Sequence, residues 1–227
     1  MSSKESAVIV GAGRGLSASL ARLFAQEGMQ VALAARNPDK LSDLVAETGG
    51  NAYACDAGDE ASVAALFDAV AGDQGAPDVV VYNPSARSRG PFVELKAEDV
   101  RRALAITCYG GFLVGQAAAK LMLERGSGSI LFTGASASVK GYPQSAPFAM
   151  GKFGLRGLVQ SMARELAPQN IHVAHFIIDG GIRAGADDGQ DAMLDPDAIA
   201  QSYLHVHRQH RSAWTWEVEL RPWVETF

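Results

Sequence analysis

Short apolar runs alternate along the chain with longer stretches whose apolar residues recur every three or four positions. Short runs rich in β-branched residues predict buried strands, and the longer periodic stretches predict helices. The predicted strands cover residues 7–10, 29–35, 51–56, 78–83, 128–134 and 171–178. The predicted helices cover residues 16–28, 37–50, 59–75, 98–125, about 147–167 and 196–209. Strands that alternate with helices imply right-handed crossovers and a parallel sheet covered on both faces.

A last apolar pattern, "AWTWEVELRPW" at 213–223, has a period of two. It places Trp214, Trp216, Val218 and Leu220 on one face and so predicts a half-buried strand. No linker, repeat or low-complexity tract interrupts the chain. We therefore expect residues 1–227 to form one α/β domain, a Rossmann-like, doubly wound and mostly parallel sheet of about seven strands.

Composition narrows the class of protein. The 227 residues are 48% hydrophobic and 20% charged, and their net charge of −5 gives no general attraction to nucleic acid or anionic membranes. No apolar run is long enough to predict a membrane span. Two cysteines make a disulfide framework improbable, so we expect a cytoplasmic protein. The histidines of "HVHRQH" lack the acidic or thiol partners of a metal site, and no metal is expected.

Candidate chemistry begins where the first strand runs into "GAGRGLS" at 11–17. Gly11 permits a tight turn, Gly15 lets backbone approach a phosphate, and the helix that opens at Leu16 points its positive end at a pyrophosphate. Because a strand precedes the loop and a helix follows it, we favour a dinucleotide site over a turn without a ligand.

The end of the second predicted strand indicates which dinucleotide binds. An acidic residue there would bond a ribose 2′-hydroxyl, but the sequence has Arg36, which suits a 2′-phosphate. Arg14, inside the glycine loop, adds a second cation whose planar fork matches phosphate. Each arginine alone is compatible with ordinary surface charge, and together they favour NADP(H) over NAD(H).

These motifs resemble those of the short-chain dehydrogenase/reductase (SDR) family over residues 5–221. "GAGRGLS" takes the place of that family's glycine motif, and "CDAGD" places Asp56 where the family contacts adenine. "YNPSA" keeps Asn83 of the family's NNAG motif, and "DGGIRA" keeps Gly180 and an apolar cofactor contact at Ile182. The resemblance implies an oxidoreductase that acts on a carbonyl, an alcohol or an activated alkene.

The family's catalytic Asn, Ser, Tyr and Lys are matched less well. Thr107 takes the asparagine position, Ala135 the serine position with Ser136 beside it, and Phe148 the tyrosine position. Lys152 alone is kept, and by resemblance it binds the nicotinamide ribose. Ala184 replaces the threonine that holds the carboxamide.

Four interpretations of Phe148 remain open, because phenylalanine has no proton to transfer. In the first, Phe148 is a core residue of a chain without a catalytic site. In the second, another residue serves as the acid, with Tyr142 as the first candidate. In the third, hydride is transferred without a protein acid, and in the fourth, the chain binds NADP(H) as a sensor without turnover. The predicted catalytic residues are Lys152, Ser136 and Tyr142.

Two expectations concern partners. The apolar stripe of residues 155–166 is compatible with plain core packing, but the matching SDR helix builds subunit interfaces, so we expect a homodimer or homotetramer that acts on a small molecule. Residues 183–197 correspond to the substrate lid and are short and acidic, which argues against an anionic substrate such as a CoA ester.

Overall fold

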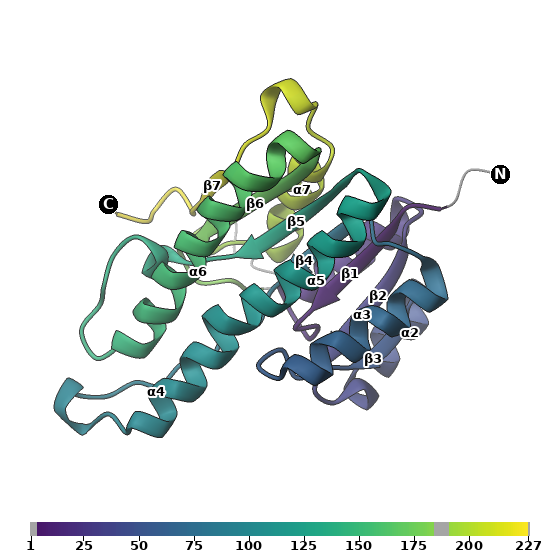
Figure 1. Ribbon diagram of the computed structural model, residues 1–227. Coiled ribbons are helices and arrows are strands. Elements are labelled where there is room, and N and C mark those ends of the chain that lie inside the picture. Colours follow the sequence, from purple (N-terminus) through teal and green to yellow (C-terminus); the bar gives the residue numbers. More distant parts are fainter. Residues whose placement is uncertain (1–3, 184–190, 227) are drawn as a thin grey trace.

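The computed structural model describes residues 4–183 and 191–226, which form one parallel sheet flanked by helices (Figure 1). The strand order is β3-β2-β1-β4-β5-β6-β7, and every neighbouring pair is parallel. The strands are β1 Ser6–Val10, β2 Gln30–Ala35, β3 Asn51–Ala54, β4 Val79–Tyr82, β5 Gly128–Thr133, β6 Ile171–Ile178 and β7 Glu217–Leu220. This confirms the predicted fold class.

The main helices are α1 Leu16–Gln26, α2 Ser42–Thr48, α3 Glu60–Gln74, α4 Ala97–Leu104, α5 Gly110–Arg125, α6 Ala146–Leu166 and α7 Pro196–His207. Six single turns join them: η1 Pro38–Leu41, η2 Phe92–Glu94, η3 Ala105–Tyr109, η4 Ser136–Ser138, η5 Ala167–Gln169 and η6 Arg211–Ala213. The η3 turn is a π-helix that joins α4 to α5, within the stretch predicted as one helix.

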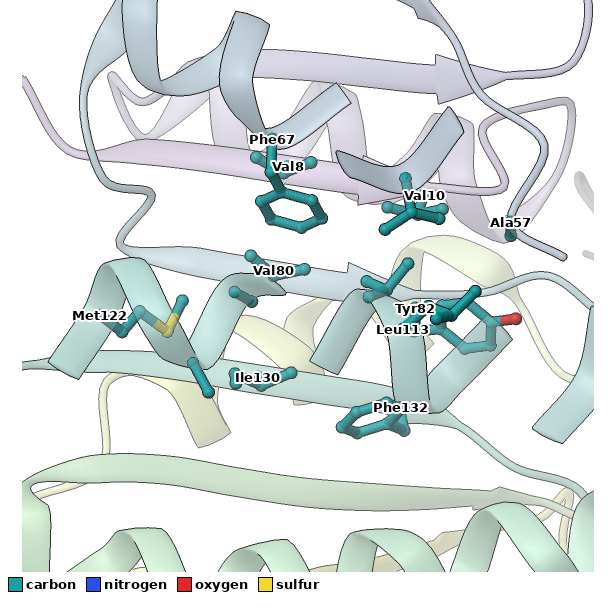
Figure 2. Packing of buried hydrophobic residues seen from close by; sticks show 14 of the residues in the cluster. Val8, Val10, Ala57, Phe67, Val80, Tyr82, Leu113, Met122, Ile130 and Phe132 are labelled. Carbon is teal, nitrogen blue, oxygen red and sulfur yellow. The ribbon is translucent and has the colours of Figure 1, made fainter. Parts of the chain in front are cut away.

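Two cores hold the layers together because the central strands are buried on both faces. Val8 and Val10 of β1 face a cluster that includes Phe67 of α3, Leu113 of α5 and Leu155 of α6. Part of this cluster is seen from close by in Figure 2. Ala7 and Ile9, the alternate residues of β1, face a second cluster with α1, α2 and α7.

The stretch Ala97–Arg125 contradicts the expectation that no apolar run is long enough to span a membrane. Its length and mean hydropathy of 1.2 are sufficient for a membrane span, although no such run was expected. Half of its most apolar window is buried inside the domain, and α5 packs against β4 and β5. Burial of this kind is what a core helix of a folded domain requires.

The predicted alternation near the end of the chain is wrong in one respect. Trp216 packs against the core formed by α3, α5 and α6, whereas Val218 and Leu220 pack against the opposite core. The four residues therefore do not share a face, because β7 begins at Glu217 and Trp216 precedes it.

The topology also locates a binding crevice. Strand order reverses between β1 and β4, since β2 and β3 extend from β1 on one side and β5 to β7 from β4 on the other. In doubly wound sheets, ligands bind outside the carboxyl ends of the strands at such a switch point.

Candidate cofactor and substrate site

The glycine turn lies directly after β1, at the switch point. Gly11 has a φ of 82°, and a Cβ there would lie 2.8 Å from the ring of Pro84. Gly15 has a φ of 84° and begins α1 without a side-chain cap. Both positions demand glycine, and the uncapped α1 terminus leaves amide groups near Leu16 for an anion.

A side-chain bridge fixes this turn to the next strand. Ser17 Oγ donates to the carbonyl of Gly11 at 2.9 Å, and Asn83 Nδ2 donates to Ser17 Oγ at 2.7 Å. The Asn83 amide also donates to the Val10 carbonyl at 3.0 Å. Asn83 thus holds the glycine turn against the end of β4, and it also lines the adjacent cleft.

A cleft of about 1210 Å³ opens over the carboxyl ends of β1 to β4. It exceeds the ~300–1,000 Å³ of ordinary small-molecule pockets, as an extended dinucleotide requires. Five of the predicted cofactor residues line it: Gly11, Arg14, Arg36, Asp56 and Asn83. Within the described ranges, neither Arg14 nor Arg36 has an ion-pair partner. A polyanion therefore fits this donor set.

Lys40 is a further cation of the cleft that the sequence analysis missed. The η1 turn carries it there, and Asn37 caps that turn by accepting from the Asp39 amide at 3.1 Å. The signal was present in "NPDK", because Asn followed by Pro commonly starts a tight helical turn. The helix expected over residues 37–50 is thus divided into the η1 turn and α2.

Lys152 of α6 is not on the cleft wall. Its side chain is buried, and its Nζ donates to the carbonyl of Thr133 at 2.6 Å. Burial, with a smaller contribution from the charge of Arg87, lowers the pKa of Lys152 to about 7. The amine therefore gains or loses its proton near neutral pH.

Phe148 lies one helical turn before Lys152 and is also buried. Lys152 Nζ is 5.8 Å from the centroid of its ring, and the guanidinium carbon of Arg87 is 4.1 Å from the same centroid. Arg87 belongs to the loop after β4 and lines the cleft. Sequence reasoning did not single out Arg87, because nothing local links it to a residue 61 positions later.

The η3 turn shapes the same end of the cleft. Thr107 is fully buried there, and its Oγ1 accepts from the amide of Ala86 at 3.0 Å. Thr107 therefore fixes the loop that carries Arg87. Gly151 of α6 allows this close packing, since a Cβ at Gly151 would lie 2.8 Å from Thr107 Cβ.

The two other predicted catalytic residues lie in or after the η4 turn. Ser136 is half-buried, and its hydroxyl has no partner in the part of the chain that the structure describes. Tyr142 is 42% exposed and lies near Lys140, whose Nζ is 5.7 Å from its ring centroid. Among the described residues, no hydrogen bond or ring contact joins Tyr142 to Phe148 or Lys152.

The remaining predicted residues follow β6. Gly180 packs against Pro222, and Ile182 is 39% exposed and forms an isolated bridge with Leu194. Neither is among the residues that line the cleft. Ala184 lies outside the described residues, as does much of the acidic lid.

A buried polar network that the sequence gave no reason to expect lies behind the η4 turn. His175 of β6 bonds Ser138 Oγ through Nε2 at 3.3 Å and Glu217 through Nδ1 at 3.1 Å. Arg156 of α6 donates to both carboxylate oxygens of Glu217 at 2.6 and 2.8 Å. Burial lowers the pKa of His175 to about 4, although the Glu217 carboxylate acts in the opposite direction.

This network resembles a nucleophile–histidine–carboxylate arrangement only in its order. Ser138 is fully buried and also accepts from the Ala135 amide at 3.2 Å, so no substrate reaches its hydroxyl. The network instead ties η4, β6, β7 and α6 to one another. Residues 4–183 and 191–226 contain no group of three His, Cys, Asp or Glu placed to hold a metal ion.

Comparisons with known proteins agree with this geometry. The family model described as Enoyl-(Acyl carrier protein) reductase matches residues 11–214. D-threitol dehydrogenase from Mycolicibacterium smegmatis is 33% identical over 172 residues, which cover 74% of this chain and 66% of that protein.

Two solved structures are similar over nearly the whole chain. A short-chain dehydrogenase from Rhodopseudomonas palustris is 39% identical with a TM-score of 0.86, covering 96% of this chain and 99% of that one. A metagenomic short-chain oxidoreductase in complex with NADP is 28% identical with a TM-score of 0.85, covering 97% and 98%. The chain belongs to the short-chain dehydrogenase/reductase family of oxidoreductases.

Proposed function

We propose that the protein is an NADP(H)-dependent oxidoreductase that acts on a small carbonyl compound, an alcohol or an activated alkene, with a non-standard proton-transfer site. The observation that carries the proposal is the cleft, which joins the Gly11 turn and the unpaired Arg14 and Arg36 to Arg87 at the other end. The solved relative that contains NADP supports the choice of cofactor.

Different residues of the chain would bind different parts of the cofactor. The amides at Gly15 and Leu16 would bind the pyrophosphate, Arg14 and Arg36 the 2′-phosphate, and Asp56 the adenine. Asn83 would hold the middle of the cleft. By resemblance to the family, Lys152, Gly180 and Ile182 would hold the nicotinamide end, although none of the three lines the cleft itself. A bound nicotinamide would supply the hydride.

Proton transfer is the step for which the site differs from its family. Ser136 offers an unpartnered hydroxyl to the substrate oxygen, and Tyr142 offers a phenol from the following loop. Lys152 is the predicted catalytic residue whose pKa lies near neutrality, the range that suits an acid or base at physiological pH. Reduction would then use one of these groups, or water, in place of the tyrosine.

The second candidate function is NADP(H) binding without turnover. The specific observation in its favour is the end of the site around Phe148. Lys152 is occupied by the Thr133 carbonyl, and Phe148 has no proton to give. A protein of this kind would report nucleotide occupancy rather than consume it.

Cofactor choice is tested by titrating the protein with NADPH and NADH. Two charge-assisted hydrogen bonds, worth ~1.5–3 kcal/mol each, predict NADPH binding at least ~10-fold tighter. Arg36→Ala should reduce that preference by weakening NADPH alone, and Arg22→Ala, whose side chain pairs with Glu47 instead, should not. Equal affinities in the wild type would contradict the assignment.

Turnover is tested by single-turnover oxidation of bound NADPH with quinones, aldehydes, ketones and enones. Loss of nicotinamide absorbance with any of them supports the enzyme, and binding of NADPH without loss for the whole panel supports the second candidate. If Tyr142 is the acid, Tyr142→Phe should slow the reaction by ~10²–10⁴, whereas Tyr109→Phe should not.

Assembly and location complete the proposal. We infer a homodimer or homotetramer, because the matching helix builds subunit interfaces in the family. Exposed aromatic side chains on η3, α5 and α6 support this inference, and Tyr109 and Phe112 among them are stacked on one another. Cys55 and Cys108 are both free thiols, which suits the proposed cytoplasmic setting.

A further inference from the structure

Two cations face the same aromatic ring at the reacting end of the cleft. The guanidinium of Arg87 and the amine of Lys152 lie 4.1 and 5.8 Å from the centroid of Phe148. Among the residues that the structure describes, neither has a carboxylate partner, and the one hydrogen bond of Lys152 is to a carbonyl. The charge of Arg87, together with that of Lys152 while its amine is protonated, is therefore concentrated here without an anion.

Arg87 is the cation of the two that a ligand in the cleft would contact. It lines the cleft, whereas Lys152 is 2% exposed and lies behind it. The loop of Arg87 is fixed on both sides, by Ala86 through Thr107 Oγ1 and by Gly90, whose amide donates to the Gln144 carbonyl at 3.2 Å. The guanidinium is thus presented by an anchored loop.

The electrostatic balance favours an anionic ligand at this point. Burial and the neighbouring Arg89 both lower the pKa of Arg87, which means that the surroundings disfavour its charge. An anion beside Arg87 would favour the charged form of the guanidinium and so offset that penalty. A guanidinium stacked on a ring keeps its edge free, and that edge matches a carboxylate bidentately.

We propose that Arg87 is a substrate-binding residue that takes the carboxylate of a small 2-oxo or 2-hydroxy acid, beside the ring of Phe148. This inference rests on the proposed oxidoreductase function and names its substrate class. It departs from the expectation drawn from the acidic segment 183–197, because the two charged groups in contact with the Phe148 ring, Arg87 and Lys152, are both basic. A single small carboxylate needs only this local charge.

The test is calorimetric binding of phenylglyoxylate and pyruvate to the protein saturated with NADP⁺, a pair in which no hydride can be transferred. Each acid is compared with its neutral amide, phenylglyoxylamide or pyruvamide. One bidentate charged contact predicts that at least one acid binds ~10-fold or more tightly than its amide. Arg87→Met should abolish the difference, and Arg87→Lys should keep only part of it.

Controls separate this proposal from its alternatives. Arg89→Met, in the same loop, should keep the preference for the acid, and melting curves verify that each variant is folded. Equal binding of acid and amide by the wild type, or no binding of either, overturns the proposal. So does an Arg87→Met variant that loses NADP⁺ affinity instead, since Arg87 would then belong to the cofactor. NADP⁺ affinity is measured first, and the acids are also titrated without nucleotide, so a failure of the cofactor assignment is recognised separately.

Discussion

At the scale of single residues, burial and neighbouring charge set the pKa of a side chain, which its residue type alone does not determine. Lys152 is a lysine at a familiar spacing, yet burial, with Arg87 nearby, lowers its pKa from the ordinary 10.5 to about 7. Phe148 removes a titratable group from the same place. The sequence reveals both identities, but not the guanidinium that lies against the ring.

The charge state of Lys152 makes the first prediction at this scale. Between pH 7 and 10.5 the unfolded chain keeps a proton that the folded protein has released, so the free energy of unfolding rises with pH. The rise is at most ~1.4 kcal/mol per pH unit. Urea unfolding at pH 7, 8 and 9 should show this extra slope for the wild type relative to Lys152→Met. Parallel profiles would show that the amine titrates normally.

At the scale of elements, close approaches of backbone decide how helices sit over the sheet. The start of α6 can lie against η3 because Gly151 and Gly154 face Thr107 and Cys108, where a Cβ would come within 2.8 Å of either side chain. Later on the same helix, Gly157 is exposed and has nothing within 4 Å of its Cβ position. Identical residues on one helix therefore serve different purposes.

This contrast predicts opposite effects of one substitution. Gly151→Ala overpacks the contact with Thr107 and should lower the free energy of unfolding by ~1–3 kcal/mol. Gly157→Ala improves helix propensity without a clash and should raise it by up to ~1 kcal/mol. Urea denaturation of both variants measures the difference. If Gly151→Ala were as stable as Gly157→Ala, the close packing of α6 on η3 would be wrong.

The network between elements predicts sensitivity to acid. The pKa of His175 is lowered by burial to about 4, so as pH falls below 6.5 the unfolded chain takes up a proton that the folded protein refuses. Stability is therefore lost between pH 6.5 and 4. The loss should exceed that of His175→Gln by up to ~1.4 kcal/mol per pH unit. Equal slopes in chemical denaturation would mean that His175 is not held neutral.

Sequence patterns predicted the elements much better than the contacts between them. Apolar runs and periodicity located all seven strands, because burial on both faces leaves a plain signal in the central ones. The face predicted for Trp216 was wrong, because the alternation of apolar and polar residues starts in the sequence before β7 begins at Glu217. Arg87 with Phe148, and His175 with Glu217, could not be paired from sequence, since each contact joins residues brought together only by the topology.

At the scale of the whole molecule, the exposed apolar side chains on η3, α5 and α6 indicate where the protein could associate with another copy. Tyr109, Phe112, Met150 and Phe153 are each 40–50% exposed near the crossing of η3 and α6. Large apolar side chains gathered in this way mark an interaction surface. On the opposite side of the sheet, α1 and α7 pack against each other and leave no comparable group among the described residues.

Assembly through this surface is the prediction that belongs to the whole molecule. Light scattering should give the mass of a dimer or tetramer for the wild type. Phe112→Glu combined with Phe153→Glu should give a smaller species, because two charges would have to be buried. Val93→Glu, at a 90% exposed site on η2, serves as the control and should assemble normally. A monomeric wild type would rule out this surface as a permanent interface.

The order of strands in the sheet has a consequence for synthesis on the ribosome. β7 follows the other described strands and helices in sequence, yet its Glu217 holds Arg156 of α6 and His175 of β6. While residues 217–220 are still inside the exit tunnel, those two groups have emerged without their carboxylate partner. The turn behind the reacting end of the cleft is therefore completed only after β7 has left the tunnel, and a nascent chain released before β7 is made should be recognised by chaperones as unfinished.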